Sequence, residues 1–293
     1  MTKLRLEGTF TALVTPFVAQ TKEIDFVALR RIVEDQIARG VNGFLSMGST
    51  GEFCTVSHEE HDRVNSAVVE YAAGRVPVIA GTGSNSTEEA VRLTQAAKAA
   101  GATACLVAAP YYNRPSPKGM YEHFKAVQDV GLPVILYCNS ARSGAHMSLE
   151  TVISLAKLPH IVGWKEATGS LEKASDVIKN TDLAVLSGDD ALTLPIMAIG
   201  GTGVTSVLSN LAPEHVVAIT DAVRRGDYEV ARRAHYACTD LLKTLFVEVN
   251  PQPVKKGMEL LGFCSAACRL PLVEASQETA DLVETQLRNA KLL

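Results

Sequence analysis

The chain is predicted to be an α/β protein whose eight parallel strands close into a (β/α)8 TIM barrel. Short apolar runs alternate with longer amphipathic stretches, which favours a parallel sheet built from strand–helix units. The apolar runs number eight, and a closed barrel requires eight such units. The 293 residues exceed the usual span of one compact domain, which leaves room for a barrel and an appendage.

The apolar runs are expected to form the strands, in chain order Thr9–Val14, Gly43–Met47, Val76–Ala80, Ala104–Ala108, Pro133–Tyr137, Ile161–Lys165, Ala184–Leu186 and Gly203–Val207. Helical patterns lie between them, for example at Asp25–Arg39, His58–Ala73, Thr87–Ala100 and Leu149–Leu158. Two helix starts carry a capping signal: Asp25 precedes an apolar stretch, and Ser57 stands three residues before Glu60.

Beyond Asn210 the strand-like runs stop and only helical patterns remain. We therefore expect the barrel, which carries the active site, in residues 1–225. A small C-terminal helical appendage is expected in residues 226–293. No linker or low-complexity segment divides the two parts.

The composition excludes several classes of partner. The chain has 28 basic and 32 acidic residues, a net charge of −4, and no basic excess of the kind that nucleic acid would attract. No apolar stretch approaches the roughly 20 residues that cross a bilayer, so no membrane partner is expected. The N-terminal residues lack the apolar core of a signal peptide, and we expect a cytoplasmic protein.

No metal or other cofactor is expected. The six cysteines are scattered and are interpreted as small core residues rather than a disulfide framework. Cys264 and Cys268 can share a helix face, but no histidine lies near them in sequence. His58 and His61 lack a third ligand and are expected at a surface or an interface. The glycines at 81 and 83 begin a dinucleotide fingerprint whose third glycine is missing.

Working residues of a barrel project from the C-terminal ends of the strands and the loops that follow. Five polar segments fall at such places: Gly48–Glu52, Pro110–Pro115, Tyr137 with Arg142, Lys165–Glu166 and Ser187–Asp190. The active site is expected where these segments converge, on one end of the barrel.

Lys165 is the strongest single indication of chemistry. Period-two alternation puts Ile161, Gly163 and Lys165 on one face of a strand, and one face of a barrel strand is the interior. Desolvation there lowers the pKa of an amine and makes its neutral, nucleophilic form accessible, so that it can form a Schiff base with a ketone. The alternative is a lysine that extends from the strand end to water or pairs with a carboxylate.

Four further side chains are candidates, each with a simpler alternative. The Tyr137 phenol can shuttle a proton, or it can be a core tyrosine with a satisfied hydroxyl. Ser49 and Thr50 lie in a glycine-flanked turn that suits a carboxylate, or form an ordinary turn. Arg142 offers a fork for a second carboxylate, or is a solvated loop arginine.

Together these motifs resemble the pyruvate-dependent aldolase family that contains dihydrodipicolinate synthase and N-acetylneuraminate lyase, and they favour its synthase branch. The resemblance covers essentially the whole chain. The matching passages are Gly48–Glu52, Val78–Gly83, Pro110–Ser116, Lys165–Gly169, Ser187–Asp190 and Asn250–Lys255. The resemblance implies a lyase that needs no cofactor, assembled as a homotetramer of two tight dimers.

The resemblance also implies roles for catalytic residues. Lys165 matches the lysine that forms the imine with pyruvate. Tyr137 matches the proton-shuttling tyrosine, and Ser49 matches the hydroxyl residue that relays to it. Tyr112 matches the tyrosine that reaches a neighbouring subunit's site.

Substrate-binding residues follow in the same way. Thr50 matches the contact to the pyruvate carboxylate, and Arg142 matches the arginine that receives the carboxylate of the second substrate. Gly188 matches a substrate-binding position, and Thr205 lies where an apolar residue usually flanks the pyruvate pocket. The loop Cys138–Ser143 departs from the synthase pattern around Arg142.

The resemblance implies condensation of pyruvate with L-aspartate 4-semialdehyde in diaminopimelate and lysine biosynthesis. A related aldolase or dehydratase that acts on a sugar acid or a hydroxy-keto acid is the first alternative. A catalytically silent barrel that senses a keto acid is the second, and the presence of Lys165, Tyr137 and Ser49 argues against it.

Some members of the synthase branch bind lysine at the tight-dimer interface. The positions that match this site are His58, His61, Asn85, Glu89 and Tyr111. Phe53 and Cys54 replace small residues at its edge, and Phe53 can fill the cavity. The alternative is an interface that serves assembly alone.

Overall fold

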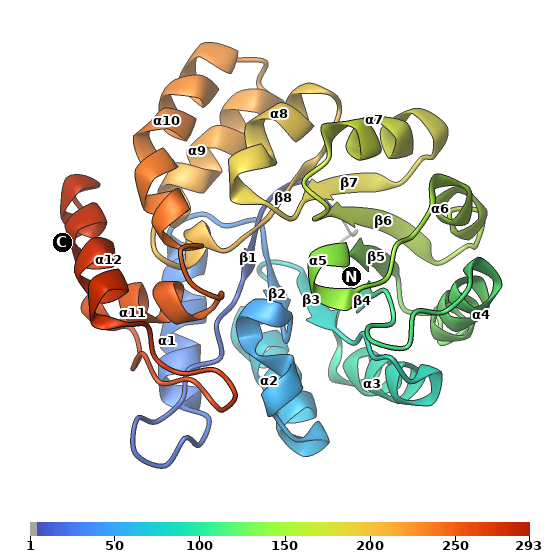
Figure 1. Ribbon diagram of the computed structural model, residues 1–293, viewed down its shortest axis with the longest axis horizontal. Helices are drawn as coiled ribbons and strands as arrows, with labels where there is room; N and C mark the ends of the chain where they lie inside the picture. The colour runs from blue at the N-terminus through green and yellow to red at the C-terminus, as the bar shows by residue number, and fades with distance from the viewer. Residues whose placement is uncertain (1–4) are drawn as a thin grey trace.

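Eight parallel strands close into a barrel in the order β1-β2-β3-β4-β5-β6-β7-β8, with helices around the outside (Figure 1). The computed structural model describes residues 5–293. The strands are β1 Gly8–Ala12, β2 Gly43–Ser46, β3 Val78–Gly81, β4 Ala104–Ala108, β5 Val134–Cys138, β6 Ile161–Glu166, β7 Ala184–Ser187 and β8 Gly203–Ser206. The predicted fold class is confirmed, and each expected strand differs from the observed one by no more than two residues at either end.

Helices follow the strands and then continue without further strands. They are α1 Phe26–Ala38, α2 His58–Ala72, α3 Thr87–Ala100, α4 Pro117–Gln128, α5 Ser140–Ser143, α6 Leu149–Leu155, α7 Leu171–Asn180, α8 Thr193–Ala198, α9 Pro213–Arg224, α10 Tyr228–Thr244, α11 Gln252–Leu260 and α12 Gln277–Asn289. Short 3-10 helices occur at η1 Ser49–Gly51, η2 Phe53–Thr55, η3 Asp190–Leu192 and η4 Leu208–Asn210.

The two predicted helix starts are confirmed. The Asp25 carboxylate accepts a hydrogen bond from the Ala28 N–H at 2.8 Å at the start of α1. At the start of α2, the Ser57 hydroxyl accepts from the Glu60 N–H while the Glu60 carboxylate accepts from the Ser57 N–H. These contacts satisfy N–H groups that the first helical turn leaves without a partner.

The predicted alternation along β6 is wrong at its first residue. Val134 of β5 pairs with Ile161 but Ile135 pairs with Gly163, so an irregularity inserts Val162 into the ladder. Ile161 therefore packs outside the barrel in the same cluster as Trp164. An extra residue of this kind shifts the side-chain alternation, which no count of residues along one strand reveals.

The barrel interior is filled by apolar side chains from many strands, among them Phe10, Leu45, Ile79, Leu106 and Leu186. Glycine makes room for the largest of them. A Cβ at Gly43 of β2 would lie 2.4 Å from the Phe10 ring of β1. Side chains thus close the centre of the barrel, and the chemistry is confined to its ends.

The C-terminal helices lie on one side of the barrel, next to α1 (Figure 1). Helix α10 packs against α9, and buried residues of α10, α11 and α12 belong to the same apolar cluster as residues of β2, α1 and α2. We propose a boundary between barrel and appendage at residue 225, where α9 has ended. No helix in residues 5–293 combines the length and the apolar character needed to cross a membrane.

The cysteines correct two expectations. Cys54 is exposed rather than a core residue, and Cys264 is only partly buried. Cys264 and Cys268 do not share a helix face, because residues 264–268 form no helix. The cysteines within residues 5–293 are free thiols, as the scattered positions predicted.

A wholly buried ion pair joins the C-terminal appendage to the loop after β2. The Lys255 ammonium of α11 donates to the Glu52 carboxylate and, at 2.8 Å, to the Ala267 carbonyl. The same carboxylate accepts the Arg269 N–H at 3.1 Å. The Lys255 ammonium also lies 4.1 Å from the centre of the Phe17 ring. The appendage and the loop are therefore held in one fixed arrangement.

We expect Lys255→Ala to lower the free energy of unfolding by about 3–5 kcal/mol, because it leaves the Glu52 charge buried without its partner. Urea denaturation followed by circular dichroism measures the change. Lys256→Ala is the matched control, since Lys256 pairs with Glu259 near the surface and should cost at most about 1 kcal/mol. Equal losses in the two variants would contradict the prediction.

Candidate active site

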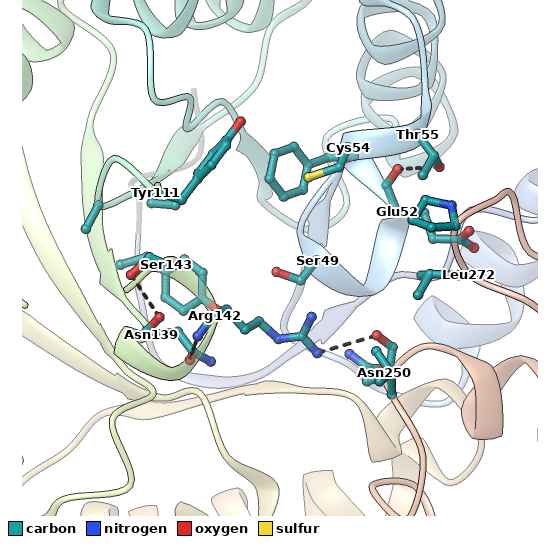
Figure 2. A pocket seen from close by; sticks show the side chains of 16 residues that line it. Ser49, Glu52, Cys54, Thr55, Tyr111, Asn139, Arg142, Ser143, Asn250 and Leu272 are labelled. Carbon is teal, nitrogen blue, oxygen red and sulfur yellow. Dashed lines mark hydrogen bonds between the residues drawn. The ribbon is translucent and has the colours of Figure 1, made fainter. Parts of the chain in front are cut away.

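A cavity of about 310 Å³ opens among the loops that follow β2, β4 and β5 (Figure 2). The C-terminal appendage closes it on one side. The residues that line it are Ser49, Glu52, Phe53, Cys54, Thr55, Ala108, Ala109, Tyr111, Tyr137, Asn139, Arg142, Ser143, Val249, Asn250, Pro271 and Leu272. The cavity therefore lies at the end of the barrel where the sequence predicted the working residues.

Lys165 lies beside Tyr137 on the inner face of the barrel. The two residues are paired across β5 and β6, and the Lys165 ammonium nitrogen lies 4.6 Å from the centre of the Tyr137 ring. Only 8% of Lys165 is exposed. Lys165 is therefore not extended to water, and within residues 5–293 it forms no hydrogen bond or salt bridge with a carboxylate, although the charge of Asp190 acts on it.

Burial lowers the pKa of Lys165 to about 8. The Asp190 carboxylate opposes this shift, while the positive charge of Arg142 adds to it. A pKa near 8 leaves an appreciable fraction of neutral amine at neutral pH, whereas an ordinary lysine has almost none. The amine is thus desolvated, uncommitted and available as a nucleophile.

Gly188 lies against the stem of Lys165, and neither Gly188 nor Thr205 lines the open cavity. A Cβ at Gly188 would lie 2.8 Å from Cε of Lys165 and 2.8 Å from the Glu166 carbonyl. Thr205 is buried in β8, and its hydroxyl donates to the Ser187 carbonyl at 3.3 Å. Any side chain at position 188 would press on the lysine, so glycine is required there for steric reasons.

Arg142 reaches the cavity from a short helix that the sequence did not predict. Asn139 caps the N-terminus of α5, where its side chain accepts the Arg142 N–H at 3.2 Å. The Arg142 guanidinium extends across the cavity floor and donates to the Asn250 carbonyl at 3.4 Å (Figure 2). Its remaining N–H groups stay available to a ligand carboxylate.

Ser49 and Thr50 occupy η1, which two residues separate from the end of β2. The Ser49 hydroxyl faces the cavity in Figure 2. The Thr50 hydroxyl is buried and accepts a hydrogen bond from the Asn250 side-chain amide at 3.0 Å. The structure therefore brings Ser49, Tyr137 and Arg142 into one cavity, with Thr50 and Lys165 in its surroundings.

Tyr112 is not brought into this cavity. It is 89% exposed, its backbone has a φ of 71°, and its N–H donates to the Ser143 carbonyl at 3.1 Å. No hydrogen bond within residues 5–293 joins Ser49, Tyr137 and Tyr112. In the single chain, the expected proton relay is therefore incomplete.

Of the residues of the expected lysine site, only Tyr111 lines the same cavity. Glu89 accepts from the Ser84 hydroxyl and contacts Nε2 of exposed His58. The Tyr111 ring packs edge-to-face against Phe53 at a centroid distance of 6.3 Å.

His61 and Asn85 lie apart from these contacts. His61 was expected at a surface or an interface, but it does not lie at the surface of the chain, because its ring is 4% exposed and its Nε2 contacts the Gly81 carbonyl at 2.8 Å. The Asn85 carbonyl accepts from the Asn113 side chain at 2.8 Å, which ties the start of α3 to the loop after β4.

No three His, Cys, Asp or Glu residues among residues 5–293 gather in a group that could hold an ion.

Comparison with known proteins identifies the family. The model of the dihydrodipicolinate synthetase family matches residues 5–290. The chain belongs to this family. A curated relative from Methanospirillum hungatei, named 4-hydroxy-tetrahydrodipicolinate synthase, is 45% identical over 285 residues, which are 96% of this chain and 98% of the relative.

Solved structures of the family agree. The crystal structure of dihydrodipicolinate synthase from Aquifex aeolicus has a TM-score of 0.96 and 42% identity, and the match covers 98% of this chain and 99% of that one. A family structure from Cyanidioschyzon merolae, described as having lysine bound, has a TM-score of 0.95 and 37% identity, with coverage of 98% and 99%.

Part of the site of this family member was not predicted from the sequence. Asn250, Val249, Pro271 and Leu272 line the cavity from the C-terminal appendage, although the active site was expected within residues 1–225. The passage Asn250–Lys255 carried the family resemblance but had no assigned task. The polar residues at its two ends could have indicated a role in the site: Asn250 contacts Thr50, and Lys255 contacts Glu52.

We expect the rate of imine formation between this family member and pyruvate to rise with pH through a midpoint near 8 rather than 10.5, because only the neutral Lys165 amine attacks a ketone. Timed samples are reduced with borohydride, and mass spectrometry gives the modified fraction at each pH. Arg142→Ala should move the midpoint upward, because it removes a positive charge that lowers this pKa. Arg232→Ala, on an exposed face of α10, should leave it unchanged. A wild-type midpoint near 10.5 would contradict the prediction.

Proposed function

We propose that this chain is a 4-hydroxy-tetrahydrodipicolinate synthase, a lyase that condenses pyruvate with L-aspartate 4-semialdehyde in diaminopimelate and lysine biosynthesis. The observation that carries the proposal is the buried Lys165 amine, with a pKa of about 8, beside a cavity at the C-terminal end of the barrel. Identity of 43–46% over nearly the whole chain to synthases of that name supports the choice of reaction. The reaction needs no cofactor.

The first half of the reaction activates pyruvate. The Lys165 nitrogen attacks the keto carbon, and the resulting carbinolamine loses water to form an iminium ion. The iminium draws electron density from the adjacent methyl group, which loses a proton and leaves an enamine. Tyr137, whose ring lies 4.6 Å from the lysine nitrogen, is the group in reach to move these protons.

The second half joins the two substrates. The enamine carbon attacks the aldehyde carbon, and the new alkoxide takes a proton through the hydroxyl groups of Tyr137 and Ser49. The amino group of the semialdehyde portion then attacks the imine carbon and displaces Lys165. This step closes the ring and restores the free enzyme amine.

Each substrate carries a carboxylate, and each carboxylate has a proposed receiver. Thr50 binds the pyruvate carboxylate, and Arg142 binds that of the semialdehyde with its planar fork. Gly188 gives the pyruvate adduct space against the lysine stem, and Thr205 flanks the pyruvate pocket from β8.

The proposed assembly is a homotetramer made of two tight dimers, in the cytoplasm. Tyr112 supports an assembly of this kind, because an 89% exposed tyrosine outside its own cavity is free to enter that of a second copy. In this proposal the partner's tyrosine completes the relay that begins with Ser49 and Tyr137.

Trapping the pyruvate adduct tests the imine. We expect borohydride with pyruvate to add one reduced pyruvate unit to the peptide that contains Lys165, as peptide mass spectrometry would show. Lys165→Ala should abolish both the label and most of the turnover. Label on Lys255 or Lys256 instead would refute the assignment, and an unlabelled protein would leave a silent barrel as the better description.

Arg142→Ala tests the second substrate. Because an arginine fork binds a carboxylate at two points, we expect its loss to raise the KM for aspartate semialdehyde or lower kcat by about tenfold or more. Labelling with saturating pyruvate should persist. Unchanged kinetics with this aldehyde would favour a sugar acid or hydroxy-keto acid, which a panel of aldehydes at fixed pyruvate would identify.

We further propose that lysine inhibits the enzyme at the dimer interface, with its ammonium groups on Glu89 and its carboxylate near Asn85 and Tyr111. His58 contacts Glu89, and the buried His61 ring contacts the Gly81 carbonyl. Since Tyr111 adjoins Tyr112, a ligand here can bias a catalytic side chain; coupling requires only a difference in affinity between two states.

Initial rates in millimolar lysine at fixed substrates test this regulation. We expect inhibition in the wild type and a weaker effect in Glu89→Gln, which removes the charge that meets the ligand's amino group. A flat response without heat of binding in calorimetry would refute the proposal. Phe53→Ala then separates the causes: if Phe53 and Cys54 have closed the pocket, removing the ring should restore inhibition.

A further inference from the structure

Asn250 forms hydrogen bonds with both proposed carboxylate receivers, Thr50 and Arg142. Its side-chain amide donates to the Thr50 hydroxyl oxygen at 3.0 Å, and its backbone carbonyl accepts from the Arg142 guanidinium at 3.4 Å. It lies 200 residues from Thr50 and 108 from Arg142 in the chain. Figure 2 shows Asn250 at the floor of the cavity, facing the tip of Arg142.

Burial and a neighbouring ion pair hold Asn250 in place. Asn250 is only 6% exposed, and it precedes α11, whose Lys255 is locked to Glu52 by the buried ion pair. Glu52 in turn stands two residues after Thr50. The ion pair between Lys255 and Glu52 therefore fixes the segment that carries Asn250 against the segment that carries Thr50.

We propose that Asn250 is a positioning residue that orients the Thr50 hydroxyl for the pyruvate carboxylate and, through its backbone, holds Arg142 for the second carboxylate. This inference rests on the proposed function and adds to it a part of the site contributed by the C-terminal appendage. It assigns the appendage a role in substrate binding.

The direction of the hydrogen bond to Thr50 carries the first half of the proposal. A hydroxyl has one proton to donate and two lone pairs to accept with. An amide N–H that occupies a lone pair leaves the Thr50 proton free, and a carboxylate is a pure acceptor that needs this proton. A carboxylate at position 250 would instead take the proton for itself.

The backbone carbonyl carries the second half. It draws one edge of the Arg142 guanidinium to the cavity floor and leaves the other N–H groups of the fork for the ligand. A side-chain substitution at position 250 leaves this carbonyl in place. The two halves of the proposal can therefore be separated by experiment.

We expect Asn250→Ala to raise the KM for pyruvate about three- to tenfold, the effect of one hydrogen bond, with a smaller change in the KM for the aldehyde. Asn250→Asp, nearly identical in shape, should raise the KM for pyruvate further, because it reverses the hydrogen bond and adds a negative charge. Asn289→Ala, an exposed asparagine of the appendage, should change neither.

A double-mutant cycle with Thr50→Val shows whether Asn250 acts through Thr50. We expect Asn250→Ala to add little to the KM for pyruvate once the hydroxyl has been removed, whereas independent effects would multiply. Multiplying effects, or equal rises in both KM values, would overturn the proposal, because a general loss of packing would produce them.

The same preparations keep this test separate from that of the proposed function. If the wild type neither traps pyruvate nor turns over aspartate semialdehyde, the proposed function fails. If the wild type does both and the two Asn250 variants keep the wild-type KM for pyruvate, only the positioning role fails. Should Asn250→Ala not fold, as thermal unfolding would show, Asn250→Asp decides the question.

Discussion

The Lys165 amine lies inside a closed barrel, where water cannot hydrate its charge, and the rest of the site is arranged around that constraint. Desolvation brings its pKa to about 8. Gly188 leaves space for its stem, and the Tyr137 ring lies beside its nitrogen. The Asp190 carboxylate favours the protonated form of the lysine, whereas the positive charge of Arg142 disfavours that form. A lysine at the same strand end but open to water would remain protonated and inert.

The appendage is as much a part of the active site as the barrel loops are. Its helices share an apolar cluster with the barrel, and the ion pair between Lys255 and Glu52 fixes their position relative to η1. Because that pair is buried, its two charges have no alternative partner in solvent, and the arrangement is rigid. The segment that holds Asn250 is thereby held against Thr50 and Arg142.

Tyr112 shares the loop between β4 and α4 with Tyr111, one of the expected lysine-site residues. Tyr112 is almost wholly exposed, while the adjacent Tyr111 lines the cavity against Phe53. In the proposed assembly, this exposed aromatic residue enters the cavity of a second copy of the chain. Assembly and regulation are proposed to act through the same short segment.

The sequence alone determined the barrel, its strand order and the convergence of Ser49, Tyr137, Arg142 and Lys165, because short apolar runs and the loops that follow them are local properties that the closed barrel then brings together. Other features were decided only by tertiary structure. The bulge at Val162, the burial of His61 and the place of Asn250 at the cavity floor each depend on a partner far away in the chain: Val134 and Ile135, the Gly81 carbonyl and the Thr50 hydroxyl. No pattern along one segment encodes where another segment will lie.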